Sequence, residues 1–316
     1  MAGGKYLLGG LLFIVAAAVG PFLPAWLISL LTISLASALV VLGLILLWRA
    51  GLVSFGQALY YAIGAYAVAL MMRWTGIQDA FVAVIIAALA AALTAYLVGF
   101  LLARYREIFF AMLSLALSMI LYGVLVKTEA LGSTDGFNVS TPTFLGYAPH
   151  GFALTIALYW FALALGAVAA MCVSAYMQSV AGALAVPVRD NEIRVEYLGV
   201  SVTKLIHLKL VIAGTLAGVG GAVAAMSISH VDPAMSYWTT SGGFVFITIL
   251  AGAGSVAAAF IGSILFELVR TASVALMPGT WQLILGTVLL LTILFVPGGL
   301  ASLFVRRRKV AGEGAQ

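Results

Sequence analysis

The sequence predicts an all-α, polytopic integral membrane protein with about 8–10 transmembrane helices. Hydrophobic residues make up 64% of the 316-residue chain and charged residues only 8%, about a third of the ~25% that is typical of soluble domains. Long apolar runs also recur from one end of the chain to the other, and a spanning helix needs roughly 20 apolar residues. We therefore expect residues 1–316 to form a single transmembrane domain.

The apolar runs place the predicted spans at residues 7–23, 26–47, 51–72, 80–102, 109–126, 152–176, 210–229, 240–257, 258–277 and 281–297. Two of these runs, 51–72 and 240–257, are rich in glycine, so broken or re-entrant helices are an alternative there. Paired interrupted spans are typical of transport pathways, although glycine is also common in ordinary membrane helices. Whether both segments cross the membrane fully stays open, and with it the choice between eight and ten spans.

Another glycine pattern predicts close helix packing. Gly214, Gly218 and Gly221 set small residues about one helical turn apart, which lets a neighbouring helix approach closely. The functional alternative is that helices slide along this contact during gating.

The basic residues predict the orientation. With the N terminus in the cytoplasm and one crossing per span, twelve of the 15 lysines and arginines fall on the cytoplasmic side, Arg73 and Lys127 fall outside, and Arg270 lies within a span. Cytoplasmic loops carry the excess of Lys and Arg, so both termini are expected in the cytoplasm. The basic tail at 301–316, which contains RRRK, is then a cytoplasmic anchor to anionic lipid rather than a nucleic-acid-binding segment.

The longest outer connection is the loop 127–151. Its GSTDGFN segment and its two prolines are typical of turns. Four polar residues on this side are candidate contacts for a docking partner: Asp135, Asn138, His230 and Asp232. For the last two, which lie beside a proline, a polar cap on the end of a span is the alternative.

The most polar internal segment is the loop 177–209, within which VPVRDNEIRVEYLGVSVTKLIHLK carries four basic and three acidic residues. Such a segment must lie at a membrane face, because ionised groups in hydrocarbon are costly. Asn191 is a typical N-cap and Gly199 a typical C-cap, so a short helix is expected between them. A second helix is expected to begin at Ser201 or Thr203 and to continue into the next span.

This short helix is predicted to present an apolar stripe. Ile193, Tyr197 and Leu198 recur at helical spacing, while Arg194 and Glu196 point elsewhere. A helix that only anchors to headgroups favours lysine and arginine on its polar face, whereas the charges here are mixed in sign. The pattern therefore favours a cytoplasmic protein partner.

Glu267 and Arg270 form the charged pair inside a predicted span. Their spacing of three places them on one helix face, where pairing lowers the cost of burying both. A structural lock and a lining of a translocation path are both open interpretations.

The sequence indicates no enzymatic activity. It contains no G-x-x-x-x-G-K-[ST] motif to hold nucleotide phosphates. Ser255 lacks the following glycine of a nucleophile elbow and has no histidine in a later span. The three histidines show no metal-ligand spacing, so no metal site is expected.

Five segments, in the same order, resemble the branched-chain amino acid ABC transporter permease family, the LivM-like membrane subunits. They are GLVSFGQALYYAIGAYAVAL (51–70), GSTDGFN (132–138), RDNEIRVEYLGVSVTKLIHLK (189–209), LAGAGSVAAAFIGSIL (250–265) and FVPGGL (295–300). The third is similar to the cytoplasmic coupling loop of these permeases, with its R-x-x-E-I…LG pattern. The segments cover most of the chain after residue 51.

The resemblance implies a non-catalytic permease subunit of a binding-protein-dependent importer in the bacterial cytoplasmic (inner) membrane. It implies a second, homologous permease subunit, two cytoplasmic ATPase subunits that bind ATP and Mg²⁺, and a periplasmic binding protein that docks on the outer, periplasmic loop. It also implies alternating access and no cofactor in this chain. The residues that would contact the ATPase are Arg189, Asp190, Glu192, Arg194, Glu196 and Gly199. Candidate residues of the translocation path are Phe55, Gln57, Tyr61, Phe244, Phe246, Glu267 and Arg270.

The loop departs from the family pattern in two places. ALAVPV precedes the charged residues, and Arg194 and Val195 replace an alanine pair. These differences leave open which ATPase is recognised.

The resemblance leaves the substrate open as well. Relatives carry branched-chain and other amino acids, urea, and aromatic or short carboxylates. The candidate lining of the path is apolar and aromatic, which favours amino acids with hydrophobic side chains.

Two other classes of membrane protein fit the sequence less well. A self-sufficient carrier driven by protons or sodium should hold carboxylates in the middle of the membrane, where only Glu267 qualifies. A passive channel or scaffold would not explain the mixed-charge loop. Dependence on an ATPase, on an ion gradient or on neither distinguishes the three classes.

Overall fold

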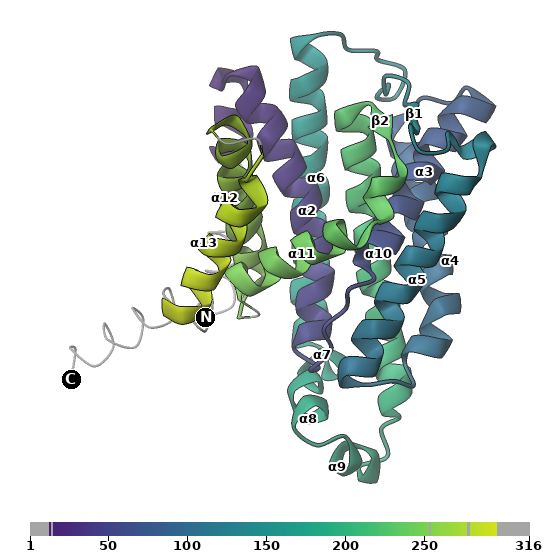
Figure 1. Cartoon of the computed structure of the whole chain (residues 1–316), viewed down its shortest axis with the longest axis vertical. Helices are drawn as coiled ribbons and strands as arrows, with labels where there is room; N and C mark the ends of the chain where they lie inside the picture. Colours follow the sequence, from purple (N-terminus) through teal and green to yellow (C-terminus); the bar gives the residue numbers. More distant parts are fainter. Residues whose placement is uncertain (1–12, 14, 253, 277–278, 296–316) are drawn as a thin grey trace.

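The computed structural model describes residues 13, 15–252, 254–276 and 279–295, and it is mostly helical. The longer described helices are α2 (Ala25–Trp48), α3 (Gln57–Thr75), α4 (Ala80–Leu102), α5 (Glu107–Lys127), α6 (Phe152–Gln178), α10 (Val202–Ile228), α11 (Trp238–Ala251), α12 (Val256–Leu276) and α13 (Trp281–Phe295). The short elements are η1 (Gly20–Phe22), η2 (Glu129–Leu131), η3 (Pro233–Ser236), α7 (Val180–Ala183), α8 (Ala185–Asp190), α9 (Glu192–Tyr197), β1 (Phe137–Asn138) and β2 (His230–Val231). Figure 1 shows α2 to α6 and α10 side by side as an upright bundle, with α12 and α13 flanking it.

Within the described part of the chain, six helices are long and apolar enough to cross a membrane: α2, α4, α5, α6, α10 and α12. The prediction of an all-α polytopic membrane protein is therefore confirmed. Several predicted spans nearly coincide with helices; the run at 80–102 is α4 itself, which begins where Asp79 accepts hydrogen bonds from the Phe81 and Val82 N–H groups. Residues 7–12 and 14 of the first predicted span, 7–23, lie outside the described residues, as do the basic tail and both termini.

The predicted span 51–72 is a helix only from Gln57 onward. Residues 49–56 form no helix, and Figure 1 shows this stretch rising from the lower end of α2 into the bundle before α3 begins. Gly51 has φ +79°, a left-handed conformation that suits glycine and stops the continuation of α2.

Serine side chains stabilise this irregular backbone. The Ser114 hydroxyl accepts a hydrogen bond from the Phe55 N–H at 3.1 Å, and the Ser241 hydroxyl accepts one from the Ala58 N–H at 3.0 Å. Non-helical backbone at membrane depth is tolerated where protein groups satisfy it. The broken-helix alternative is thus the correct one for this segment.

The second glycine-rich run, 240–257, is also broken. α11 ends at Ala251, and Gly252 has φ +79° before α12 begins at Val256. Figure 1 shows α11 lying obliquely rather than parallel to the bundle. The predicted span 210–229 is part of the longer helix α10, which begins at Val202 with Ser201 as its cap, so the expected helix that starts near Ser201 or Thr203 and continues into this span is present.

The centre of the fold is α2, which is almost entirely buried and packs mainly on α10, α6 and α12. Glycines permit the closest approaches of α10. A methyl group on Gly214 would meet the Ala95 side chain, one on Gly218 would overlap the Ala91 side chain, and one on Gly221 would overlap the Tyr61 carbonyl. The packing interpretation of this glycine pattern is confirmed.

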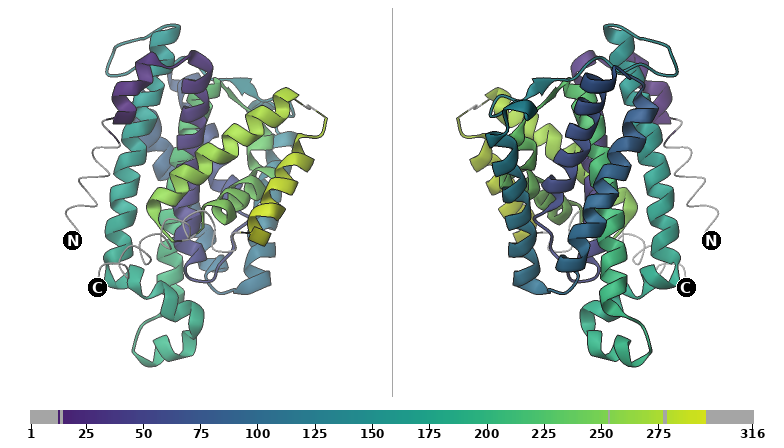
Figure 2. Two further views of the ribbon diagram at one scale, coloured as in Figure 1. Left: turned by 90° about the vertical axis from the view of Figure 1, so that its left-hand side faces the viewer. Right: turned by 90° about the vertical axis from the view of Figure 1, so that its right-hand side faces the viewer.

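The two ends of the bundle differ in charge. We call the end that carries α7–α9 the loop end and the opposite end, with β1 and β2, the strand end; Figure 2 shows α7–α9 projecting beyond the bundle in both side views. The described helices and turns bring these basic residues to the loop end: Arg49, Arg104, Arg106, Arg189, Arg194, Lys204 and Lys209. Arg73 and Lys127 lie at the strand end. The fold thus separates the described basic residues between its two ends in the way that the predicted orientation requires.

Candidate functional site

The loop 177–209 folds into three short helices, and a side chain caps the start of two of them and of α10. Ser179 accepts from the Gly182 N–H at 3.3 Å, Asn191 from the Arg194 N–H at 3.0 Å, and Ser201 from the Lys204 N–H at 3.5 Å. Gly199 has φ +82°, and its N–H donates to the Glu196 carbonyl at 2.9 Å. The predicted helix between Asn191 and Gly199 is therefore present as α9.

Two buried valines anchor α8 and α9 to the bundle. Val188 and Val195 are almost fully buried and pack in one apolar cluster with residues of α2, α4, α5 and α10. Burial of apolar side chains favours one fixed position of these short helices, which would be unstable alone.

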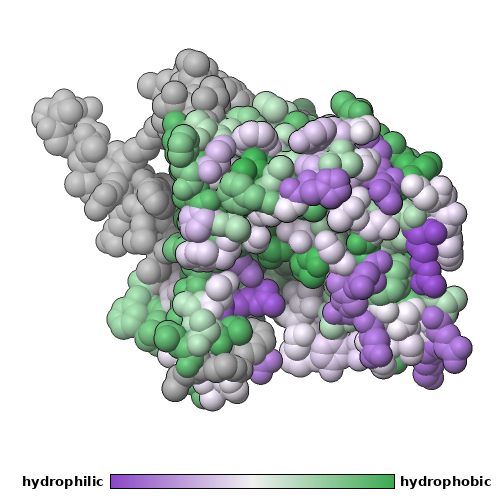
Figure 3. Space-filling view, turned by 90° about the horizontal axis from the view of Figure 1, so that it is seen from above, coloured by the Kyte–Doolittle hydropathy of each residue, from purple (hydrophilic) through white to green (hydrophobic). Residues whose placement is uncertain are grey.

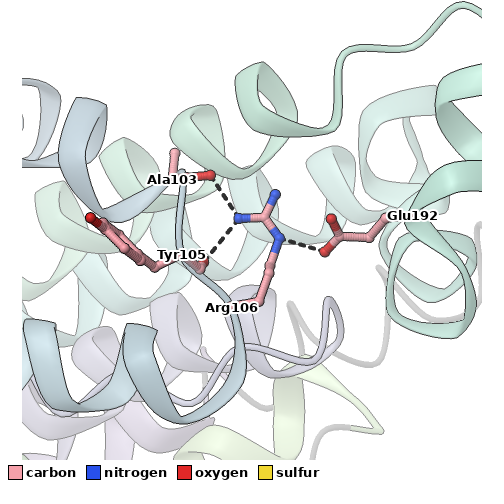
Figure 4. A network of polar contacts seen from close by, with 4 residues as sticks. All are labelled: Ala103, Tyr105, Arg106 and Glu192. Carbon is pink, nitrogen blue, oxygen red and sulfur yellow. Dashed lines mark hydrogen bonds and ion pairs between the residues drawn. The ribbon is translucent and has the colours of Figure 1, made fainter.

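An ion pair provides a second attachment. The Arg106 guanidinium, in the turn between α4 and α5, pairs with the Glu192 carboxylate at the start of α9. The same guanidinium donates to the Ala103 carbonyl at 2.7 Å and the Tyr105 carbonyl at 2.9 Å, as Figure 4 shows. Glu192, expected to contact a partner, therefore also fixes α9 to the bundle, a role the sequence did not reveal because Arg106 lies 86 residues away.

The face of α9 away from the bundle is apolar and exposed. Ile193 is 65% exposed, Tyr197 87% and Leu198 75%. We call these three side chains the α9 stripe; the first two lie on a six-residue helix that projects from the bundle, and Leu198 is the residue that follows it. The predicted stripe is thus present, and a projecting apolar cluster of this kind is typical of a protein-binding surface.

The other charged candidates for ATPase contact lie on α8 and α9, beside the α9 stripe. Arg189 and Asp190 pair with each other at 3.3 Å, and the stem of Arg189 packs on Gly51. Arg194 and Glu196 are exposed. The candidate ATPase-contact residues therefore lie together on the loop end, although Glu192 and Arg189 also make contacts within the chain.

The ion pair predicts a measurable change in local stability. Glu192→Gln removes the negative charge, and because both side chains are partly exposed the pair contributes only about 0.5–1 kcal/mol. We expect amide hydrogen exchange in α9 to become roughly twofold to fivefold faster. Asp190→Asn is the matched control and should leave amide exchange in α9 unchanged. Equal exchange rates in the two variants would contradict a role of the ion pair in holding α9 on the bundle.

Among the candidate residues of a translocation path, those of α3 and α11 come together. The rings of Tyr61 and Phe244 lie edge to face, with centroids 5.1 Å apart. Phe55 packs against the same apolar cluster. Gln57, the first residue of α3, is 0% exposed, and neither polar atom of its side chain has a hydrogen-bond partner among the described residues.

Glu267 and Arg270 pair on α12, as predicted, with 3.3 Å between Oε1 and Nη1. The Glu267 side chain is 13% exposed and that of Arg270 47%, so the pair lies at the surface of this chain within a helix of spanning length. Tyr61 is within electrostatic range of both groups. Phe246 lines an apolar groove formed by α11, α12 and α13.

The four candidate docking residues lie at the strand end. β1 and β2 pair antiparallel, which places Asn138 Oδ1 3.0 Å from His230 Nδ1. Asp232 accepts from the Met235 N–H at 3.2 Å and caps η3, so it is a polar cap on this short helix rather than on the end of a span. Asp135 accepts from the Thr134 hydroxyl at 3.2 Å. Figure 3, a view onto this end, shows hydrophilic side chains gathered there.

No group of three or more His, Cys, Asp or Glu side chains that could hold a metal ion comes together in the part of the chain that the structure describes.

Comparison with known proteins identifies one matching family and similar proteins of the same kind. Residues 26–294 match the family described as the permease component of the branched-chain amino acid transport system. The chain is 27% identical over 300 residues to the high-affinity branched-chain amino acid transport system permease protein LivM of Escherichia coli, covering 86% of this chain and 69% of that protein. It is 25% identical over 292 residues to the LivM of Salmonella typhimurium, covering 83% and 67%. No solved structure matches significantly.

Proposed function

The chain belongs to the family of permease components of branched-chain amino acid transport systems, and we propose that two partner ATPase subunits drive its transport cycle through the α9 stripe. As a member of this family it is a multi-pass protein of the bacterial inner membrane and a permease subunit of an ABC transporter. It therefore acts together with other subunits rather than alone.

The observation that carries this proposal is the combination of an exposed stripe with a fixed base. Tyr197 projects from the loop end, while Val195 and Glu192 hold the same helix on the bundle. A partner that binds the stripe can therefore displace α9 and, through it, α10 and the turn between α4 and α5. ATP and Mg²⁺ would be bound by the partner ATPases, and this chain would need no cofactor of its own.

The ATPase-contact surface would comprise the stripe and the charged residues around it, namely Arg189, Asp190, Glu192, Arg194, Glu196 and Gly199. Mixed charges around an apolar centre suit a protein groove, where rim charges steer the encounter and apolar side chains supply most of the affinity. The loop end would then face the cytoplasm, as its basic residues favour, and both termini would lie on that side.

The translocation path would run past the start of α3, α11 and α12. Its lining would include Phe55, Gln57, Tyr61, Phe244, Phe246, Glu267 and Arg270. The support is that α3 begins inside the bundle, that the side chain of Gln57 has no hydrogen-bond partner among the described residues, and that the pair on α12 places charge at a depth where lipid disfavours it. Motion of the spans would expose this region to each side of the membrane in turn, for a branched-chain or other hydrophobic amino acid.

The strand end would receive the other partner. Asp135, Asn138, His230 and Asp232 lie on the face opposite the loop end, where a periplasmic binding protein would release its ligand. A second, homologous permease subunit would complete the path.

Purification in mild detergent tests this assembly. A tagged chain taken from its native membrane should retain two ATPase subunits and a second permease of similar size, identified by mass spectrometry. Recovery of this chain alone, still able to take up solute after reconstitution, would instead support a stand-alone, ion-coupled carrier.

A further inference from the structure

Lys209 is a buried cation at the base of the loop. It lies in the second turn of α10 and is 1% exposed. A buried ammonium group is costly unless protein groups replace the water that it loses. The position of those groups therefore indicates what the lysine holds in place.

Two contacts of Lys209 lie on the segment that leads into the loop. Its Nζ donates a hydrogen bond to the Ala181 carbonyl in α7 at 3.3 Å. The same Nζ lies 5.1 Å from the centre of the Tyr176 ring, near the end of α6, in a cation–π arrangement. One side chain thus joins the end of α6, the short helix α7 and the start of α10.

These three segments form the base through which the loop connects to the bundle. The chain leaves the bundle at the end of α6 and returns in α10, so a displacement of α9 that travels along the chain passes through this base. α7 has only four residues and cannot remain rigid on its own. The charged groups near the ammonium include Arg49 at the end of α2, which repels it, so the contacts with Ala181 and Tyr176 must hold it there.

We propose that Lys209 is a positioning residue that locks the base of the loop, so that a displacement of α9 moves α6 and α10 as one unit. Without the lock, part of the displacement would be lost in bending α7. This inference rests on the proposed drive by partner ATPases, and it assigns to Lys209 a role in the efficiency of transport rather than in folding.

The test uses the complete transporter, the permeases with their ATPases, in proteoliposomes supplied with the binding protein, and measures solute uptake per ATP hydrolysed. Lys209→Met removes the charge but keeps the length of the side chain, and we expect uptake per ATP to fall at least ~10-fold while ATP hydrolysis continues. Lys209→Arg should retain most of the uptake per ATP, because a guanidinium can still donate to the Ala181 carbonyl and stack on the Tyr176 ring. Lys204→Met, at an exposed position of the same helix, is the control and should change nothing.

Tyr176 supplies a second test that does not depend on Lys209→Met assembling. Tyr176→Phe keeps the ring and should keep the ratio, whereas Tyr176→Leu removes the cation–π contact and should lower it severalfold. An unchanged ratio in both Lys209→Met and Tyr176→Leu, or a loss of uptake strictly proportional to the loss of assembled complex, would overturn the lock. Failure of the unaltered complex to couple uptake to ATP would instead refute the proposed function.

Discussion

Replacing Tyr197 with aspartate is expected to abolish ATP-driven uptake while leaving the chain folded and inserted. Tyr197 is 87% exposed at the end of α9 and contributes little buried area to the bundle. In a partner groove, a buried aromatic residue of this kind typically contributes about 2 kcal/mol or more, ~30-fold in affinity, and aspartate would add an unpaired charge. Uptake in vesicles and co-purification of the ATPases should therefore both fall by roughly that factor or more.

The matched control is Tyr197→Phe, which keeps the ring and should transport normally. The detergent-solubilised aspartate variant should elute and denature like the unaltered chain, because no contact within the bundle is lost. Normal uptake with bound ATPase in Tyr197→Asp would remove the α9 stripe from the mechanism.

Gly221→Ala is expected to give the largest loss of stability. A methyl group at this position of α10 would overlap the carbonyl of Tyr61, a backbone atom that cannot turn aside, so α3 and α10 must separate. Overpacking in a close-packed interior costs typically 1–3 kcal/mol and occasionally more, and we expect about 3 kcal/mol here. The measurement is unfolding of the purified chain in a mixed-micelle denaturant titration.

Gly123→Ala tests whether the effect comes from the contact or from the residue type. Gly123 also lies in a helix, α5, and nothing stands within 4 Å of a methyl group added there. Since alanine is the better helix former, this variant should be as stable as the unaltered chain or slightly more so. Equal destabilisation of both variants would contradict the packing account of the α10 glycines.

The sequence predicted those features that depend on local patterns. The bounds of α4 follow from an uninterrupted apolar run that begins just after the capping residue Asp79. The ends of α9 follow from Asn191 and Gly199, whose side-chain and backbone chemistry acts within a few residues. The α9 stripe follows from helical spacing within one short segment.

Features that depend on distant partners could be predicted only as alternatives or not at all. α3 starts late because Ser114 and Ser241, from other helices, satisfy its irregular backbone, and apolar periodicity does not report such partners. Likewise, the sequence shows that Glu192 is charged but not that Arg106 holds it. Lys209 was recognised only as one more basic residue of the loop, since its burial depends on how α6, α7 and α10 meet.

We propose that ATP hydrolysis in partner subunits drives transport through this chain. The most direct measurement is uptake of radiolabelled leucine into proteoliposomes that contain the purified complex, with the binding protein and ATP supplied on their respective sides and all ion gradients dissipated. We expect uptake that requires ATP and is lost in Tyr197→Asp but not in Tyr197→Phe. Uptake that proceeds without ATP and follows an imposed proton or sodium gradient would contradict the claim.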